Sequence, residues 1–324
     1  MRTIEKYQEI VTAFLAEMEL PKSPKSLYDP IHYIMSIGGK RLRPVLTLMT
    51  AEIFDADPLD AIHAAVAVEL FHNFSLIHDD IMDDAPLRRG NQTVHEKWDV
   101  NTGILSGDAL LIIAYKFFEQ YEPATFQKLA KLFSKTALEV CEGQQLDVDF
   151  ETREDVAIPE YIQMIQYKTA VLVAAAMQMG AIVAKTTEEN AALIYEFGIN
   201  LGLAFQLQDD YLDCFGDPLT FGKQVGGDII ENKKTYLYIK AMELAVAEDK
   251  AQLLHLFSVH PQDPTQKIEA VKELFVTTKA AEHTLALIEE YTLKAFENLE
   301  SLSISQDKKE VLIAFGKNLM KRTV

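Results

Sequence analysis

Residues that break helices or crosslink chains are scarce in this 324-residue sequence. It has 14 Gly and 11 Pro, and no stretch rich in Gly, Pro or Ser separates one part of the chain from another. Its two cysteines, Cys141 and Cys214, lie far apart and fit neither a disulfide framework nor a zinc site, which favours a reducing compartment. We therefore expect a single domain over residues 1–324.

Basic charge is also scarce, because 31 Lys and Arg stand against 49 Asp and Glu, a formal net charge of −18. Surfaces that bind nucleic acid need clustered Lys and Arg, so this composition argues against that class of partner. The longest nearly uncharged run, residues 169–184, is shorter than the roughly 20 residues that cross a bilayer. The N-terminal segment lacks the continuous apolar core of a signal peptide. The expectation is a cytoplasmic protein without a transmembrane segment.

In place of these features, the sequence has helical periodicity almost throughout. Apolar residues recur every three or four positions, and no segment shows the sustained alternation of a strand. Breaks rich in Gly, Pro, Asp and Asn separate the helical stretches. Residues 169–184 and 193–208 are apolar on more than one face, which favours a central place for them in a bundle. The sequence thus predicts an all-α fold, a single large helical bundle.

The short motif DDxxD occurs twice, as DDIMD (79–83) and DDYLD (209–213), each at the end of an apolar helical stretch. Residues three and four apart share a face of a helix, so the first and last aspartates of each motif are neighbours. Paired carboxylates of this kind chelate hard cations such as Mg²⁺, with substrate phosphates and water as further ligands. Uncompensated carboxylates in apolar surroundings would be costly. Two such motifs therefore predict metal sites more strongly than either does alone.

Basic residues accompany both motifs. They are Lys40 and Arg43 in GGKRLRP (38–44), Arg88 and Arg89 after the first motif, Lys168, and Lys223 and Lys233 after the second. Acids that hold Mg²⁺, together with separate Lys and Arg groups, suit two polyanionic phosphate groups, one bound through metals and one bound directly. No Ser-His-Asp or Cys-His arrangement and no P-loop stands out in the sequence. Metals and cations on apolar helices suit the ionisation of a phosphate ester of a hydrophobic molecule.

Several of these segments together resemble one enzyme family. They are GGKRLRP, HDDIMDDAPLRRG, EGQQLD (142–147), YKTA (167–170) and FQLQDDYLDCFGD with GKQVGGDIIENKKT (205–235). In this order they resemble the trans-polyprenyl diphosphate synthases, in the short-chain group that makes farnesyl and geranylgeranyl diphosphate. The resemblance covers roughly residues 30 to 240 and implies a bundle of the isoprenoid synthase type with a central active-site cavity. It also implies a homodimer.

The reaction that the resemblance implies is a Mg²⁺-dependent condensation of isopentenyl diphosphate with an allylic diphosphate, which is dimethylallyl, geranyl or farnesyl diphosphate. The implied metal ligands are Asp79, Asp80, Asp83, Asp209, Asp213 and Asp228. They would hold three Mg²⁺ ions, with Mn²⁺ as a substitute, and Asp80 would act from behind the other ligands. The implied contacts to the allylic diphosphate are Arg88, Lys168, Lys223 and Lys233, and those to isopentenyl diphosphate are Lys40, Arg43, His72 and Arg89.

Other roles follow from the same resemblance. Gln144 and Asp147 border the active site, and the Lys168 carbonyl, the Thr169 hydroxyl and the Gln206 amide oxygen stabilise the allylic cation. The basic residues, Lys223 and Lys233 among them, stabilise the departing diphosphate together with Mg²⁺. The released diphosphate takes the proton, so no protein base is required. Asp84 receives no role.

Product length depends in this family on bulk just before the first motif, where Phe71, Phe74 and Ser75 stand. Helix geometry alone does not select the position that usually closes the tunnel in this family, because Ser75 and Phe71 lie more directly beneath Asp79 than Phe74 does. A large aromatic followed by a small residue most resembles the pattern for geranylgeranyl diphosphate (C20). Farnesyl diphosphate (C15) is the nearest competitor, and a longer product would follow if Phe71 and Phe74 pack aside.

Three other readings fit parts of the pattern. A histidine-aspartate metal phosphohydrolase would explain "HDD" at 78–80 but neither the second DDxxD nor GGKRLRP. A class I terpene cyclase shares DDxxD, yet its second metal motif is normally of a different type. A non-catalytic subunit of a two-component prenyl synthase should have lost one or both acidic motifs. At the C-terminus, Lys321 and Arg322 read as a frayed basic tail or as a lid over the isopentenyl site.

Overall fold

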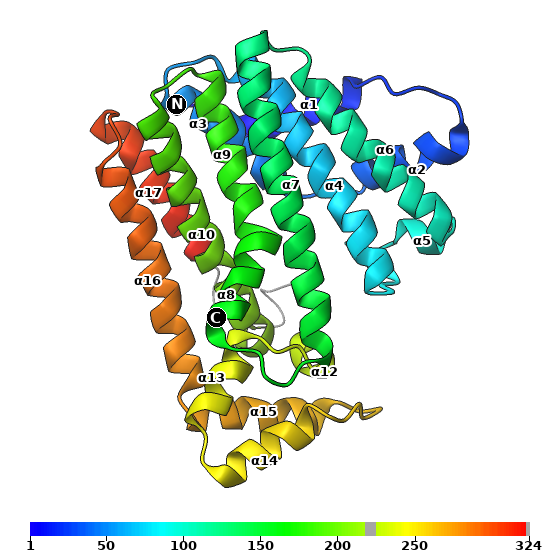
Figure 1. The fold of residues 1–324 in the computed structure, drawn as a ribbon, viewed down its shortest axis with the longest axis vertical. Coiled ribbons are helices and arrows are strands. Elements are labelled where there is room, and N and C mark those ends of the chain that lie inside the picture. Colours follow the sequence, from blue (N-terminus) through cyan, green and yellow to red (C-terminus); the bar gives the residue numbers. More distant parts are fainter. Residues whose placement is uncertain (218–224, 322–324) are drawn as a thin grey trace. The chain divides into compact units, whose positions relative to one another are not determined.

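The computed structural model describes residues 1–217 and 225–321, and most of these residues lie in helices (Figure 1). The first helices are α1 (Ile4–Glu17), α2 (Lys25–Ser36), α3 (Leu42–Ile53), the 3₁₀ turn η1 (Pro58–Ala61), α4 (Ile62–Met82), α5 (Val94–Lys97) and α6 (Val100–Phe118). The long α7 (Pro123–Thr152) is followed by α8 (Ile158–Ile165), the π-helical turn η2 (Gln166–Ala170), α9 (Val171–Val183) and α10 (Glu188–Phe215). The last are α12 (Gly227–Ile230), α13 (Tyr236–Leu244), α14 (Ala247–Leu256), α15 (Thr265–Thr277), α16 (Ala280–Glu300) and α17 (Gln306–Met320).

The predicted all-α class is confirmed. The described residues contain just two short strands, β1 (Leu87–Arg88) and β2 (Asn91–Gln92), which pair antiparallel. Within the same residues, no helix has both the length and the apolar character that crossing a bilayer requires.

Contacts between Cα atoms divide the chain into two compact units. Unit 1 comprises residues 1–135 and 175–195, and unit 2 comprises residues 136–174 and those from 196 onward. Helices α7, α9 and α10 each contribute residues to both units. The single domain expected over residues 1–324, and a central cavity, stay predictions.

The core of unit 1 is organised around α4, which packs most extensively against α6 and α3. Side chains of α4 are buried around most of its circumference, as expected for a helix at the centre of a bundle. Glycines on α6 allow the two helices to approach closely at the acidic end of α4. A Cβ at Gly107 would lie 2.4 Å from His78 Nε2, and one at Gly103 would lie 2.8 Å from Ile81 Cδ1.

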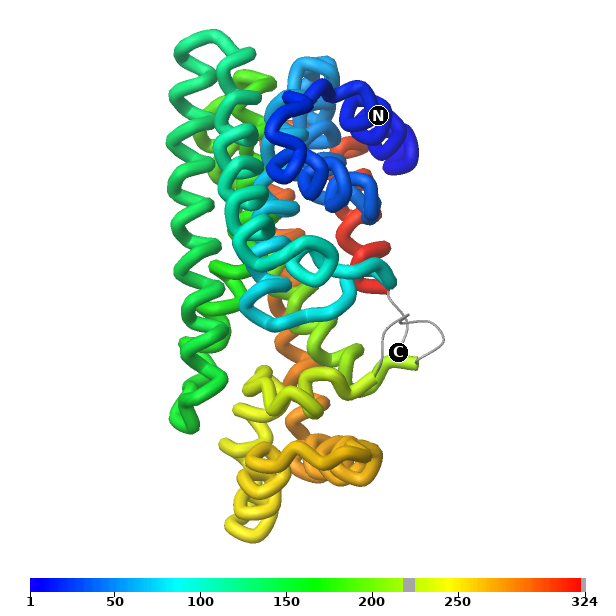
Figure 2. Tube along the Cα trace, turned by 90° about the vertical axis from the view of Figure 1, so that its right-hand side faces the viewer, coloured from blue at the N-terminus to red at the C-terminus, as the bar shows by residue number. Residues whose placement is uncertain are grey.

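Unit 2 has a similar close approach around η2. Gly198 and Gly202 of α10 face Ala174 and Ala170, where an added Cβ would lie 2.5 and 2.7 Å from the two Cα atoms. On the α7 side, a Cβ at Gly143 would lie 2.3 Å from the backbone nitrogen of Lys168. Farther along the chain α13, α14 and α15 pack against one another, visible as the yellow and orange group in Figure 2. The backbone of η2 is therefore held between small residues of α7 and α10.

We expect Gly143→Ala to lower the free energy of unfolding by about 1–3 kcal/mol, because the new methyl group would overlap the backbone of η2. At an unconstrained helical position the same change would raise it, by up to about 1 kcal/mol. Chemical denaturation measures the difference. Glu142→Ala, at the exposed neighbouring position, is the control and should change stability by less than about 0.5 kcal/mol. A Gly143→Ala protein as stable as the wild type would contradict the close packing.

Candidate active site

The first acidic motif lies where α4 ends, and its aspartates face different surroundings. Asp80 is 1% exposed, whereas Asp79 is partly exposed and Asp83, the C-cap of α4, is exposed. Arg88 donates from Nε to both carboxylate oxygens of Asp80, at 2.8 and 2.9 Å, and its Nη2 lies 2.6 Å from Asp80 Oδ1. Arg88 Nη2 lies 3.6 Å from Asp79 Oδ2. Asp80 is thus occupied by Arg88 while Asp79 and Asp83 are accessible, and a role for Asp80 behind these two stays a prediction.

Arg88 reaches Asp80 because it stands on a hairpin that the sequence did not predict. Strands β1 and β2 pair Leu87 with Gln92 and Arg88 with Asn91. The two turn residues, Arg89 and Gly90, have φ values of 53° and 77°. Positive φ at both central positions is typical of the type I′ turns that close two-residue hairpins. Two residues per strand are too few for the alternation that identifies strands in a sequence.

The predicted isopentenyl diphosphate residues of unit 1 come together beside this hairpin. Arg43 Nη1 lies 3.1 Å from His72 Nε2. Arg89 donates to the carbonyl of Gly38, and the missing side chain of Gly39 makes room, since a Cβ there would lie 2.5 Å from Arg89 Nη1. Lys40 follows directly in the chain. The GGKRLRP turn, α4 and the hairpin thus form one basic cluster.

Burial lowers the pKa of His72 well below its ordinary value, and the Arg43 and Arg89 guanidinium groups lower it further. The imidazole is therefore neutral near pH 7. A guanidinium can only donate, so Nε2 of His72 accepts from Arg43. His72 orients this arginine and adds no charge to the cluster.

Sequence reasoning missed Arg41, which lies between Lys40 and Arg43. It is the N-cap of α3, with φ of 48°, and forms an ion pair with Glu69, which is 3% exposed. Arg41 Nη2 also donates to the carbonyl of Met35 at 2.6 Å. A glutamate inside an apolar helical stretch was the available signal, because a buried carboxylate needs a partner.

Aromatic rings pack along α4 before the first motif. The ring centroids of Phe71 and Phe74 lie 5.4 Å apart, those of Phe74 and His78 lie 4.7 Å apart, and Phe133 of α7 lies 5.2 Å from Phe71. Phe71 is 1% exposed and Phe74 is 8% exposed. The Ser75 hydroxyl donates to the carbonyl of His72 at 2.9 Å. Phe74 therefore stands between a wholly buried ring and the histidine next to Asp79.

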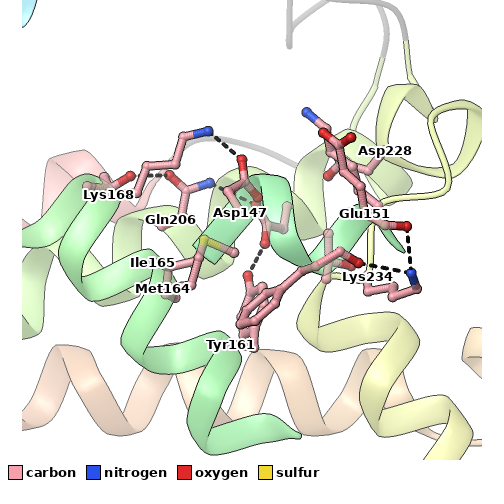
Figure 3. A pocket seen from close by; sticks show the side chains of 14 residues that line it. Asp147, Glu151, Tyr161, Met164, Ile165, Lys168, Gln206, Asp228 and Lys234 are labelled. Carbon is pink, nitrogen blue, oxygen red and sulfur yellow. Dashed lines mark hydrogen bonds and ion pairs between the residues drawn. The ribbon is translucent and has the colours of Figure 1, made fainter. Parts of the chain in front are cut away.

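In unit 2, a cavity of about 130 Å³ gathers predicted residues from four elements (Figure 3). It is lined by Asp147, Phe150, Glu151, Tyr161, Met164, Ile165, Lys168, Thr169, Gln206, Asp210, Asp228, Lys233, Lys234 and Thr235. Lys168 Nζ lies 2.5 Å from Asp147 Oδ2. The Thr169 hydroxyl donates to Gln206 Oε1 at 3.1 Å, and Gln206 Nε2 donates to Asp210 Oδ1 at 2.8 Å. The segments EGQQLD, YKTA and FQLQDDYLD therefore meet in one cavity.

Tyr161 ends this chain of hydrogen bonds and was not predicted. It is 1% exposed, and its hydroxyl donates to Asp210 Oδ2 (Figure 3). Forty-nine positions separate the two residues, and a lone tyrosine in a helical stretch carries no signal for such a contact.

Carboxylates of the second motif crowd around the start of α12. Asp213 Oδ2 accepts from the backbone nitrogen of Asp228 at 2.9 Å, and the backbone nitrogen of Gly226 donates to the carbonyl of Asp213 at 2.6 Å. Burial raises the pKa of Asp228, and the Asp210 and Asp213 carboxylates raise it further. Burial likewise raises the pKa of Asp210, while the donors Tyr161 and Gln206 oppose the shift. Such a set of oxygen ligands suits a divalent cation, whose charge would favour their ionised forms.

The remaining predicted residues are distributed as follows. Asp209 lies on α10 and is partly exposed. Lys233 Nζ lies 3.0 Å from Glu231 Oε2, and Gln144 has a buried Nε2 without a hydrogen-bond partner in the described part of the chain. Gln208 donates to the carbonyl of Met320 at 2.8 Å, which holds the end of α17, next to Lys321, against α10. Lys223 and Arg322 lie outside the described residues.

Comparisons with known proteins agree with these motifs. The family model described as polyprenyl synthetase matches residues 24–274. The chain is 37% identical over 323 residues to a short chain isoprenyl diphosphate synthase of Methanothermobacter thermautotrophicus, with 99% of this chain and 98% of that protein covered. It is 55% identical to a geranylgeranyl pyrophosphate synthase of known structure, with a TM-score of 0.96 and full coverage of both chains. A synthase from Corynebacterium glutamicum, solved with isoprenyl diphosphate and magnesium, is 25% identical, with a TM-score of 0.88 and coverage of 99% of this chain and all of that chain.

The raised pKa values of Asp210 and Asp228 predict a pH dependence. Aspartate in an unfolded chain has a pKa of ~4, whereas burial raises the pKa of Asp210 to about 7 and that of Asp228 to about 8 in the folded, metal-free protein. At pH values between the unfolded pKa and these raised pKa values, the folded state holds protons that the unfolded state has released. The stability that they contribute is therefore complete below pH ~4 and is lost as the pH rises through 7 and 8.

We expect the Tm of the metal-free protein to fall more steeply from about pH 5 to about pH 8.5 than the Tm of Asp228→Asn. Mg²⁺ should flatten the wild-type curve, and its binding near pH 7 should release protons. Calorimetry in buffers of different ionisation enthalpy measures that release. Parallel curves and no proton release would contradict the raised pKa values.

Proposed function

The chain belongs to the polyprenyl synthetase family and is a trans-prenyltransferase, and we propose that it elongates allylic diphosphates with isopentenyl diphosphate as far as geranylgeranyl diphosphate. The observation that carries the proposal is the pair of acidic motifs, each accompanied by its own cations. In unit 1, Asp80 of the first motif is paired with Arg88, and in unit 2, Asp210 of the second motif lines one cavity with Lys168 and Lys233. A non-catalytic subunit would have no use for both motifs.

Magnesium is the cation that the family uses, and the carboxylates of this chain suit it, because hard oxygen ligands are what Mg²⁺ prefers. We propose that Asp79 and Asp83 hold two ions, and that Asp209, Asp213 and Asp228 hold a third, with Mn²⁺ as a substitute. Bound ions supply charge neutralisation for the departing diphosphate. The backbone nitrogen of Asp228 already fixes the Asp213 carboxylate at 2.9 Å, which supports a preformed site.

The basic residues then divide between two diphosphates. Arg88, Lys168 and Lys233, together with Lys223, are proposed to bind the allylic diphosphate. Lys40, Arg43 and Arg89, with His72, are proposed to bind isopentenyl diphosphate. The contact of His72 with Arg43 supports this second role, since a neutral imidazole fixes the guanidinium and leaves its charge for the substrate.

The allylic cation that forms when the diphosphate leaves is stabilised by nearby oxygen atoms, whose partial negative charge offsets its positive charge. We assign that role to the Lys168 carbonyl, the Thr169 hydroxyl and Gln206 Oε1, with Gln144 and Asp147 bordering the site. The hydrogen bond that the Thr169 hydroxyl donates to Gln206 Oε1, at 3.1 Å, supports the assignment because it holds the two oxygen atoms side by side. The released diphosphate takes the proton from the new carbon chain. The free thiols Cys141 and Cys214 support a cytoplasmic location.

The direct test incubates purified protein with Mg²⁺, isopentenyl diphosphate and farnesyl diphosphate, and identifies products by mass spectrometry. Geranylgeranyl diphosphate should accumulate. Asp79→Asn and Asp209→Asn should lower kcat at least about 100-fold, since each removes a charged metal ligand. The absence of any product longer than the starter would overturn the proposed function. A protein that hydrolyses phosphate esters instead would support the phosphohydrolase reading.

We propose that Phe74 limits the length of the product, with Phe71 behind it. Phe74→Ala should shift the main product beyond C20, because the ring that stands between Phe71 and His78 is removed. Chromatography of the dephosphorylated products measures their length. Phe117→Ala on α6 is the control, since that ring packs on Phe14 and His63 instead, and its product should stay at C20. An unchanged product from Phe74→Ala would remove Phe74 from this role, and a C15 product from the wild type would favour the farnesyl alternative.

A second copy of the chain is the proposed partner for an exposed apolar face of α6. Ile104, Leu105 and Ile112 lie within about 100° of one another around this helix, and they are 40%, 60% and 60% exposed. Large apolar side chains gathered on one face favour association over solvent exposure. We therefore assign the homodimer implied by the family resemblance to this face of α6 in unit 1.

We expect the wild type to have the mass of a dimer in light scattering, and Leu105→Glu to shift it toward the monomer, because a charge would be buried in the interface. Leu293→Glu, at a 54% exposed position of α16, is the matched control and should stay dimeric. A Leu105→Glu protein of unchanged mass would place the interface elsewhere.

A further inference from the structure

Asp84, the aspartate left without a role by the prenyl transfer scheme, lies in a cluster with His95 and Glu96. The Nε2 atom of His95 lies 3.9 Å from Asp84 Oδ1 and 3.9 Å from Glu96 Oε1. One nitrogen and two carboxylate oxygens therefore lie within 4.8 Å of one another. The cluster flanks the arginine hairpin, because Asp84 precedes β1 and His95 follows β2.

His95 is the anchor of this cluster. Its side chain is 5% exposed, and both ring nitrogens are buried without a hydrogen-bond partner in residues 1–217 and 225–321. An imidazole nitrogen taken from water without a partner is costly, so its burial beside two carboxylates requires an explanation. His78, the other histidine near the end of α4, does have a hydrogen-bond partner, because its Nε2 lies 3.2 Å from the carbonyl of Ile104.

The two carboxylates contrast with His95 in being accessible. The Asp84 side chain is 96% exposed and that of Glu96 is 46% exposed. The backbone of Asp84 adopts the left-handed conformation, with φ of 48°. A buried nitrogen ligand thus meets two carboxylates that are free to rotate, while solvent has access for water ligands.

We propose that Asp84, His95 and Glu96 form a binding site for a divalent transition-metal ion of the Zn²⁺ type, separate from the acidic motifs. Imidazole with carboxylates suits Zn²⁺ and its neighbours, whereas Mg²⁺ favours oxygen ligands alone. Ligand atoms around a tetrahedral zinc ion lie roughly 3.3 Å apart, given bonds of about 2.0–2.1 Å. The two contacts of His95, at 3.9 Å, would shorten by about 0.6 Å, and no pair of ligand atoms would need to approach by more than about 1.5 Å. Rotation of the exposed carboxylates can supply these shifts, and water completes the shell.

An ion at this site would fasten the base of the arginine hairpin. The two sides of the base already meet through the backbone, since Thr93 N donates to the carbonyl of Pro86 at 3.2 Å and the Thr93 hydroxyl donates to that of Ala85 at 2.8 Å. The metal would add a side-chain link between Asp84 and His95. Arg88 and Arg89 lie inside the segment that it closes, so the ion would restrict the motion of both.

The competing arrangement is a protonated His95 that pairs with both carboxylates and binds no metal. The two arrangements differ in whether the folded protein binds Zn²⁺ at this cluster. Metal binding to His95 requires its neutral form, whereas the ion pair requires the imidazolium form.

The experiment measures Zn²⁺ binding to chelator-treated protein by calorimetry, with excess Mg²⁺ present to occupy the acidic motifs. The variants are Asp84→Asn, which tolerates the left-handed backbone, and Glu96→Gln. Asp108→Asn is the matched control, because Asp108 is an exposed carboxylate 3.9 Å from His78. All three change exposed side chains, so folding should be preserved, and circular dichroism checks it.

The wild type and Asp108→Asn should bind one Zn²⁺ that Asp84→Asn and Glu96→Gln bind at least about tenfold more weakly. Zn²⁺ should also raise the Tm of the wild type more than that of Asp84→Asn. Equal Zn²⁺ stoichiometry and affinity in all four proteins would overturn the proposal. So would histidine NMR signals that show His95 protonated near neutral pH and unmoved by Zn²⁺. Neither readout depends on prenyl transfer.

Discussion

The concentration of negative charge in apolar surroundings is the constraint on which the rest of the structure depends. Among the described residues, each buried carboxylate is met by a donor of its own: Asp80 by Arg88, Glu69 by Arg41, and Asp210 by Tyr161 and Gln206. Isolated buried charges are costly, and pairing reduces that cost when the hydrogen bonds are satisfied. The paired acids hold the scaffold in place, and the other acids at the same helix ends are those that we propose as ligands of metal ions.

This division explains why consecutive aspartates face different surroundings. In DDIMD, Asp80 is buried against Arg88 while Asp79 and Asp83 are accessible. In DDYLD, Asp210 is buried against Tyr161 while Asp209 and Asp213 are partly exposed. The second aspartate of each motif is held by its donor, and the outer two are the pair that we propose to chelate a metal ion. The two motifs use different donors, a guanidinium and a phenol, for the same structural purpose.

The sequence predicted the all-α class, because that class depends on helical periodicity. The family resemblance assigned Arg43 and His72 to one site without predicting their contact, and the structure places Arg43 Nη1 3.1 Å from His72 Nε2. The sequence did not predict Arg41 with Glu69 or Tyr161 with Asp210, since partners 28 and 49 positions apart are chosen by packing. A charged residue in an apolar helix shows that a partner must exist without showing which one. The β1–β2 hairpin was missed because its geometry depends on backbone angles at Arg89 and Gly90.

The π-helical turn η2 determines what a deletion in this segment would do. A turn of this kind contains one residue more than an α-helical turn, so it behaves as a single-residue insertion in an otherwise continuous helix. Deleting that residue would rotate all of α8 relative to α9 by about 100°. Tyr161 on α8 would then leave Asp210, while Gly202 would still face Ala170. Point substitutions can change this cavity gradually, but a deletion of one codon here would separate its walls in a single step.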